Sequence, residues 1–333
     1  MNSQPILCID DDPNNLALLR QILEQDYELI FARDGESGIE AAIKHEPCLI
    51  LLDVEMPGMN GLEAAQILSS IKTLKYTPII FVTSLNREFD EQKGFDAGAV
   101  DYITKPVSAP ILQSRIKTHL KLVNASAFQR VQKAAIHMLA EAGHYNDNDT
   151  GMHIWRMAEY SERLALLAGW SSADAKMLRL AAPMHDTGKI GIPDQILKKK
   201  GPLSAEEWVI MRQHPTIGFA ILSKSEEKIF KLAAEISLCH HEKWTGGGYP
   251  NNLEGLQIPE SARIVAVADI FDALSIKRPY KDAWPHDKII NELKTLAGNH
   301  LEKRLVDLFI NDMEQILMIK DHWAKKEAQE VNN

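Results

Sequence analysis

The sequence predicts two domains of different fold class, a doubly wound α/β domain followed by an all-α domain. The chain has 333 residues, which exceeds the roughly 100–200 residues of one ordinary domain. The first part alternates short apolar runs with helical patterns, and beyond about residue 120 the strand signals nearly vanish. We therefore place the α/β domain at residues 1–122, a helical linker at 123–145, the all-α domain at 146–325 and a polar tail at 326–333.

Five short apolar runs predict the strands of a parallel sheet: "PILCI", "YELIFA", "CLILLDV", "TPIIFVT" and "DYITKP". Uninterrupted runs such as "CLILL" and "PIIFV" are typical of strands buried on both faces of such a sheet. Helical patterns such as "NNLALLRQILEQ" separate the runs, which predicts right-handed βαβ units. The pattern is helical through "NASAFQRVQKAAIHMLAEA", and the rest of the chain is a series of helical stretches broken by Gly, Pro and Asp.

Composition excludes several classes of function. Hydrophobic residues make up 45% and charged residues 25% of the chain, which is typical of a globular protein. The formal net charge of -9 argues against a nucleic-acid partner, and no apolar run approaches the roughly 18 residues of a membrane span. Cys8, Cys48 and Cys239 form no CxxC pair, which fits reduced thiols. We expect a cytoplasmic protein.

Polar residues gather at the ends of the predicted strands. Residues 10–12 are three aspartates that directly follow the first strand, and Asp53 ends the third. Thr83 ends the fourth and Lys105 the fifth. Because ligands bind at the carboxyl ends of strands in an open parallel sheet, these side chains predict a pocket for Mg²⁺ and a phosphoryl group. The alternative is that each aspartate merely caps the helix that follows it.

The motifs "IDDDP", "LLDVEMPGMNG", "FVTS" and "AGAVDYITKP" resemble the receiver domain of two-component response regulators over residues 1 to about 122. The steps of thirty residues from 53 to 83 and twenty-two from 83 to 105 fit that family too. The resemblance implies a flavodoxin-like fold, phosphorylation by a cognate sensor histidine kinase, and a bound Mg²⁺. The residues it implies are the phospho-acceptor Asp53, the Mg²⁺ ligands Asp10, Asp11 and Asp53, and the switch residues Thr83, Tyr102 and Lys105.

The predicted all-α domain contains eight candidate metal ligands: Asp149, His153, His185, Asp186, His214, His240, His241 and Asp269. Imidazoles with bridging carboxylates suit Fe or Mn in a multinuclear cluster, with Zn or Ni as alternatives. Thiolates are absent from the set, which argues against a structural zinc site. Each residue also has a structural explanation. His214 could be a helix-terminal cation, Asp149 a helix cap, and Asp269 the partner of a buried arginine such as Arg263.

Several motifs in residues 130 to 320 resemble HD-GYP domains, the bacterial cyclic-di-GMP phosphodiesterases. They are "MHDTGK", "IPDQIL", "EEWVIMRQHPTIG", "HHEKWTGGGYP" and "KRPYK". The resemblance implies that Asp186 bridges two metal ions. His153, His185 and Asp269 would complete one metal site, His214, His240 and His241 the other, and Asp149 would serve a third ion. The resemblance also implies that His185, Asp186 and Lys189 are catalytic. The substrate-binding residues it implies are Lys189, Tyr249, Arg278 and Lys281.

The implied reaction is attack on phosphorus by a hydroxide that bridges two metal ions. The products would be pGpG and, after a second cut, GMP. Asp149 stands where the family often has Glu, which leaves a two-metal centre open. Phosphorylation of Asp53 would control turnover, and further implied partners are diguanylate cyclase domains and a second copy of the chain. Two other functions stay open: a catalytically weak cyclic-di-GMP sensor or protein-interaction module, and a hydrolase of another cyclic dinucleotide.

Overall fold

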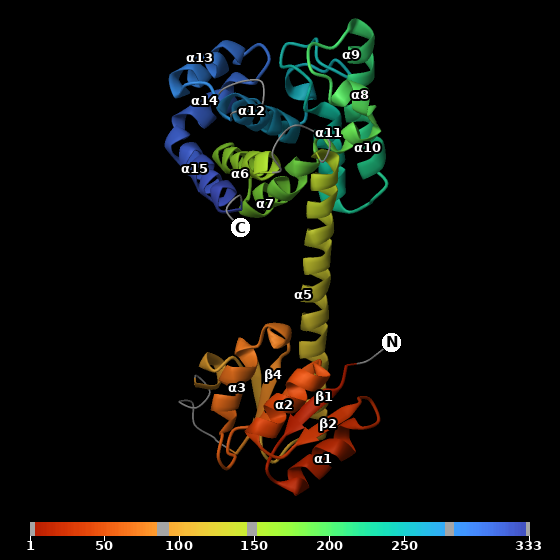
Figure 1. Cartoon of the computed structure of the whole chain (residues 1–333), viewed down its shortest axis with the longest axis vertical. Coiled ribbons are helices and arrows are strands. Elements are labelled where there is room, and N and C mark those ends of the chain that lie inside the picture. The colour runs from red at the N-terminus through yellow and green to blue at the C-terminus, as the bar shows by residue number, and fades with distance from the viewer. Residues whose placement is uncertain (1–3, 85–92, 145–151, 277–282, 331–333) are drawn as a thin grey trace. The chain divides into compact units, whose positions relative to one another are not determined.

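The chain divides into two compact units, Met1–Gln132 and Lys133–Asn333, shown in Figure 1. The division falls within one helix, α5 (Ala109–His144), so the narrower linker boundaries at 122 and 145 stay predictions. The three cysteines are free, with Cys8 and Cys239 buried and Cys48 half-buried. This computed structural model describes residues 4–84, 93–144, 152–276 and 283–330.

The first unit contains a parallel five-stranded sheet in the order β2-β1-β3-β4-β5. Each of the five predicted apolar runs forms one strand, so the predicted doubly wound α/β fold is confirmed. The change of direction in strand order lies beside β1, and the carboxyl ends of β1 and β3 are adjacent there. The strands are β1 (Ile6–Ile9), β2 (Leu29–Ala32), β3 (Leu49–Asp53), β4 (Ile79–Thr83) and β5 (Asp101–Thr104).

Helices cover both faces of this sheet. Successive strand side chains point to opposite faces, so Leu7 and Ile9 belong to one apolar cluster and Ile6 and Cys8 to another. Residues of α2 and α3 complete the first cluster, and residues of α1 and of the start of α5 complete the second. The helical elements here are α1 (Pro13–Leu23), α2 (Gly35–His45), α3 (Gly61–Ser70) and the 3-10 turn η1 (Lys72–Leu74).

The second unit is helical, with one isolated β-bridge between Ala297 and Leu301 among its described residues. This agrees with the predicted all-α domain. Its α-helices are α6 (Met152–Leu167), α7 (Ser172–Ala181), α8 (Asp194–Leu197), α9 (Ala205–Met211), α10 (His214–Leu222), α11 (Lys228–Cys239), α12 (Glu260–Ser275), α13 (His286–Leu296), α14 (Lys303–Asn311) and α15 (Met313–Glu330), and its 3-10 turns are η2 (Ala182–Met184), η3 (Thr187–Gly191) and η4 (Gly255–Gln257).

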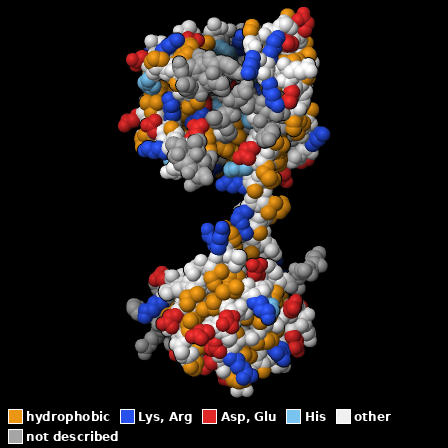
Figure 2. Space-filling view, in the orientation of Figure 1, with side chains coloured by type: hydrophobic (Ala, Val, Ile, Leu, Met, Phe, Trp, Pro, Cys, Tyr) orange, Lys and Arg blue, Asp and Glu red, His pale blue; other side chains and the backbone are white. Residues whose placement is uncertain are grey.

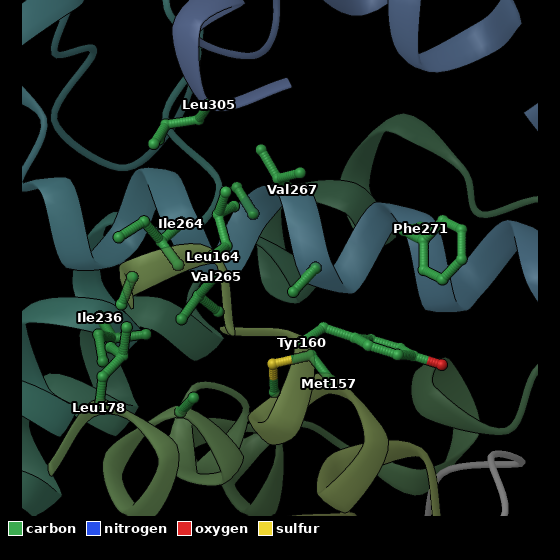
Figure 3. Packing of buried hydrophobic residues seen from close by; sticks show 14 of the residues in the cluster. Met157, Tyr160, Leu164, Leu178, Ile236, Ile264, Val265, Val267, Phe271 and Leu305 are labelled. Atoms are coloured by element: carbon green, nitrogen blue, oxygen red, sulfur yellow. The ribbon is translucent and has the colours of Figure 1, made fainter. Parts of the chain in front are cut away.

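Helix α12 lies in the core of the second unit (Figure 3). Its sequence "VAVADIFDALS" is apolar on every side, and Ile264, Val267 and Phe271 are fully buried. The rings of Tyr160 and Phe309 pack edge-to-face on Phe271, with centroids 5.2 and 5.0 Å away. Such a helix gives the acids it carries a position inside or beside the core, where a cluster of ligands can form.

Helix α5 contributes side chains to both cores. Leu112 and Ile116 belong to an apolar cluster of the first unit, and Ile136 and Ala140 to the core of the second. Apolar atoms also show on its surface (Figure 2), where Phe128 is among the exposed side chains. No helix in the described parts of the chain combines the length and the apolar character needed to cross a membrane.

Candidate metal centre

An acidic pocket lies at the carboxyl ends of β1 and β3 in the first unit. Carboxylate oxygens of Asp10, Asp11 and Asp53 lie within 4.8 Å of one another. The Nζ atom of Lys105 is 2.8 Å from Asp10 Oδ2 and 2.7 Å from Asp53 Oδ2. Asn15 Nδ2, which the sequence reasoning did not single out, donates to Asp10 Oδ1 at 2.9 Å. Hard oxygen ligands in this number suit Mg²⁺.

Asp53, the predicted phospho-acceptor, is buried in this pocket, as is Asp10. Burial raises the pKa of Asp53, and the hydrogen bond from Lys105 opposes that rise only in part. Thr83 is buried at the end of β4, and Tyr102 is half-buried with its ring packed against Phe95 at 6.4 Å. Thr83 and Lys105 thus lie at the carboxyl ends of β4 and β5, and Tyr102 lies within β5 opposite Phe81.

Helix capping accounts for one of the three consecutive aspartates. Asp12 is the N-cap of α1, and its side chain accepts a hydrogen bond from the backbone N–H of Asn14 at 2.8 Å. The capping alternative thus holds for Asp12, which was not among the predicted Mg²⁺ ligands.

The predicted ligands of the second unit come from separate segments that meet in space. Asp149, Arg278 and Lys281 lie outside the described residues. His153 is in the first turn of α6, and His214 begins α10. Ligand atoms within each of two groups lie within 4.8 Å of one another: Asp186 with His214, His240 and His241, and His153 with His185 and Asp269.

Four of these histidines donate a hydrogen bond from Nδ1 to an oxygen atom. Carbonyl and carboxylate oxygens accept, so Nδ1 carries the proton and Nε2 presents a lone pair. Histidines that bind metal are oriented in this way by a second hydrogen bond. The acceptors are Asp272 Oδ2 for His153 at 2.6 Å, the carbonyl of Ala182 for His185 at 3.0 Å, that of Met211 for His214 at 2.8 Å and that of Ser237 for His240 at 2.9 Å.

The Nε2 lone pairs point at two carboxylates. Two acceptors that face each other need a cation between them, a proton or a metal ion. Oδ1 of Asp186 and Nε2 of His185 are buried and make no hydrogen bond to any described residue. Nitrogen and carboxylate donors in this ratio fit a first-row transition metal. The distances are 3.2 Å from His185 Nε2 to Asp186 Oδ2, 3.2 Å from His214 Nε2 and 3.6 Å from His240 Nε2 to Asp186 Oδ1, and 3.4 Å from His153 Nε2 to Asp269 Oδ1.

The electrostatics of the centre agree with this donor set. Burial raises the pKa of Asp186, but Lys189 and His185 outweigh burial and hold that pKa well below its usual range. Burial lowers the pKa of His153, but hydrogen bonds to Asp269 and Asp272 raise it to about 10, so without a metal ion a proton lies between Nε2 and Asp269, and a bound ion would take its place. Lys189 Nζ lies 2.7 Å from Asp186 Oδ2. The acids of the centre are therefore ionised and hold positive charge close to them.

Asp272 and Arg156 support the centre, and sequence reasoning missed both. Asp272 is 1% exposed and accepts two hydrogen bonds from the equally buried Arg156, at 2.9 and 3.1 Å, besides the one from His153. Their signal was spacing: Asp272 follows Asp269 by three residues and Arg156 follows His153 by three, so each pair shares a helix face. The suggested pairing of Asp269 with Arg263 is wrong, because Arg263 pairs with Glu302.

Close backbone packing fixes the position of the turn that follows His185 and Asp186. A Cβ atom on Gly188 would lie 1.8 Å from the carbonyl oxygen of His214, so only glycine allows η3 to approach the start of α10. His214 is the first residue of α10. The dipole of α10 disfavours a cation there, but His214 Nδ1 donates to the carbonyl of Met211 at the C-terminal end of α9, so the helix-terminal alternative stays open beside the ligand role.

The glycine-rich loop after His241 is tied down at its base. The buried carboxylate of Glu242 accepts hydrogen bonds from the backbone N–H groups of Asn251 and Leu253, at 2.7 and 3.0 Å. The ring of Tyr249 stacks on that of His241 with centroids 4.6 Å apart. The ring of Tyr249 thus covers one face of the His241 imidazole.

Comparisons with known proteins agree with both units. Residues 6–117 match the response regulator receiver domain, and residues 113–305 match the HD domain. A probable cyclic di-GMP phosphodiesterase of Vibrio cholerae is 35% identical over 98% of this chain and 81% of its own length. The cyclic di-GMP phosphodiesterase response regulator RpfG of Xanthomonas campestris is 34% identical over 97% and 92%. A 3'3'-cGAMP-specific phosphodiesterase 2 of Vibrio cholerae is 44% identical over 58% of this chain and 37% of its own length.

Proposed function

The chain belongs to the HD domain family, with a response regulator receiver domain ahead of the HD domain, and from this membership we propose that it is a metal-dependent phosphodiesterase that hydrolyses cyclic di-GMP. The observation that carries the proposal is the set of Nε2 lone pairs aimed at ionised Asp186 and Asp269. This tautomer leaves Nε2 free to bind a metal ion, as a metal-dependent phosphodiesterase requires.

The residues of the centre divide into two ligand sets. Asp186, His214, His240 and His241 would hold one ion, and His153, His185 and Asp269 a second, with Asp186 shared. Fe or Mn suits this mixture of imidazole and carboxylate, and Asp149 would serve a third ion. When bound, such ions supply a water of lowered pKa and offset negative charge on a phosphoryl group.

The chain's own groups then bind and orient the substrate. Lys189 places an ammonium beside Asp186, where it would offset charge that develops on the phosphoryl oxygens. Tyr249 offers an aromatic ring at the edge of the histidine group. Arg278 and Lys281 would bind the ligand's phosphates, as their motif suggests. The products we propose are pGpG and, after a second cut, GMP.

The choice of cyclic di-GMP rests on the named activities of the relatives that align along most of both chains, in Vibrio cholerae and Xanthomonas campestris. A second candidate is cyclic GMP-AMP, because the 3'3'-cGAMP-specific relative aligns at 44% identity over 58% of this chain. Both substrates contain the phosphodiester that the centre would cleave. Turnover of the two dinucleotides at equal concentration separates the candidates.

Regulation is the second part of the proposal. A cognate sensor histidine kinase would phosphorylate Asp53, with Mg²⁺ held by Asp10 and Asp11 and the phosphoryl group contacted by Thr83 and Lys105. Helix α5 supports a link to the HD domain, since its residues pack in both cores. Diguanylate cyclase domains and a second copy of the chain stay predicted partners.

The test is hydrolysis by protein prepared without oxygen and reconstituted with Fe²⁺ or Mn²⁺. We expect pGpG or GMP from cyclic di-GMP, and loss of both product and bound metal in a His185→Ala/Asp186→Ala variant. Bound metal and bound nucleotide without turnover would refute the enzyme and leave a sensor. Beryllium fluoride should change the rate in the wild type and leave an Asp53→Ala variant unchanged; equal wild-type rates with and without it would refute regulation.

A further inference from the structure

His144 is a buried histidine that has no part in the proposed function. It is the last residue of α5, and it is 6% exposed. Neither ring nitrogen, Nδ1 nor Nε2, has a hydrogen-bond partner among the described residues. Four other histidines of the centre place Nδ1 on an oxygen acceptor. A buried polar group left without a partner costs about 1–3 kcal/mol, so His144 needs a compensating contact.

The surroundings of His144 supply metal ligands. Its ring lies 5.3 Å from that of His185 and 6.1 Å from that of His153, measured between centroids. Ligand atoms of His144, His185 and Asp186 all lie within 4.8 Å of one another. Nε2 of His185 and Oδ1 of Asp186, which also lack a hydrogen bond within the described part of the chain, are acceptors as well. One divalent cation can satisfy several such acceptors at once.

The position of His144 is fixed by backbone packing. A Cβ atom on the preceding residue, Gly143, would lie 2.8 Å from the Cα atom of Thr187. The last turn of α5 therefore rests directly on the turn that carries Asp186, and a side chain at residue 143 would push it away. Glycine at this point costs helix stability, and the close approach of two backbones is what it allows.

We propose that His144 is a further metal ligand, which gives one ring nitrogen to an ion shared with His185 and Asp186. The class of ion is a divalent first-row metal, as for the rest of the donor set. The inference rests on the proposed metal-dependent function, but it concerns metal binding alone. It adds a ligand from α5 to a centre whose other described ligands all lie after position 152.

The test measures Mn²⁺ binding by the full chain rather than turnover. Metal-free wild type, His144→Ala and His144→Phe are titrated with Mn²⁺, with stoichiometry from mass spectrometry and nitrogen coupling from pulsed electron paramagnetic resonance. Phenylalanine fills the volume without offering a ligand atom. We expect both variants to bind at least one ion more than tenfold more weakly and to lose the coupling of one nitrogen.

The matched control is His137→Ala, seven residues earlier on the same helix. The ring of His137 stacks on that of Trp155, with centroids 4.1 Å apart, and does not belong to the metal centre. It should bind Mn²⁺ as the wild type does. Wild-type affinity and nitrogen coupling in His144→Phe would overturn the proposal and leave His144 a packing residue, even if His144→Ala fails to fold. Absence of turnover in a metal-loaded wild type would refute the proposed function and leave this inference standing.

Discussion

Replacing Asp272 by asparagine tests whether the residues behind the ligands set metal affinity. Asp272 accepts from His153 Nδ1 at 2.6 Å and from Nε and Nη2 of Arg156 at 2.9 and 3.1 Å. Asparagine keeps the shape but has one oxygen, so its NH₂ group must face either the imidazole or the guanidinium. If it faces His153, Nδ1 loses its acceptor and the ring can take the tautomer in which Nε2 is protonated and cannot bind metal.

The structure gives the expected magnitudes. Loss of a hydrogen bond that orients a metal-binding histidine lowers metal affinity about 10–100-fold, which is about 1.4–2.8 kcal/mol. Asp272 and Arg156 are both 1% exposed, and breaking a buried pair of this kind costs about 3–5 kcal/mol of stability. Asp272→Asn should therefore weaken Mn²⁺ binding and also destabilise the metal-free second unit.

The assay is Mn²⁺ titration with a competing chelator, beside urea unfolding of the metal-free protein. Asp312→Asn is the matched control, because Asp312 also binds an arginine, Arg163, through two hydrogen bonds at 2.6 and 2.7 Å but accepts none from a described histidine. It should lose at most about 1 kcal/mol of stability and no metal affinity. If Asp272→Asn bound Mn²⁺ as tightly as the control, the orienting role would be refuted.

Three further changes test other parts of the structure. Gly188→Ala should empty the metal centre, because the added methyl collides with the His214 carbonyl oxygen; metal analysis of the purified protein measures it. Glu242→Gln should weaken the two hydrogen bonds at the base of the glycine-rich loop by about 1–3 kcal/mol in total, read as faster amide exchange there. Burial raises the pKa of Asp101, but Arg115 and His119 lower it below its ordinary value. Its stabilising effect is therefore present above about pH 3.9 and is lost as pH falls through the lowered value. Asp101→Asn should speed exchange in β5 at pH 7, with a difference of about 1 kcal/mol that shrinks below pH 4; an equal difference at both pH values would contradict the assignment.

The sheet was predictable because its strands have no helical alternative. "CLILL" and "PIIFV" are too short to make a helix and are bounded by Pro, Asp or Thr, so each run has one reading. The acidic pocket follows from topology, since parallel strands bring their carboxyl ends to one edge. Asp12 shows the limit of that reasoning: three adjacent aspartates look alike in sequence, and the start of α1 decides which one is a cap.

The metal centre was predictable as a set of residue types and motif positions, and its supporting residues were not. Helix α12 is apolar on every side, so periodicity cannot tell which way Asp269 and Asp272 point. His144 ends a long helix as a lone histidine, a position that is usually a solvated helix terminus. What distinguishes it is the contact of Gly143 with Thr187, which joins segments more than forty residues apart.

The charges of the second unit explain why Asp272 and Arg156 belong to the same centre as the metal ligands. Asp186, Asp269 and Asp272 bring three carboxylates together, and among the described residues the lysine and arginine in contact with them are Lys189 and Arg156. Without a metal ion, the excess negative charge must be met by protons on imidazoles that are otherwise buried and neutral. A divalent ion removes that conflict and satisfies the facing lone pairs at once. Metal binding should therefore contribute to the folding stability of the second unit as well as to its chemistry.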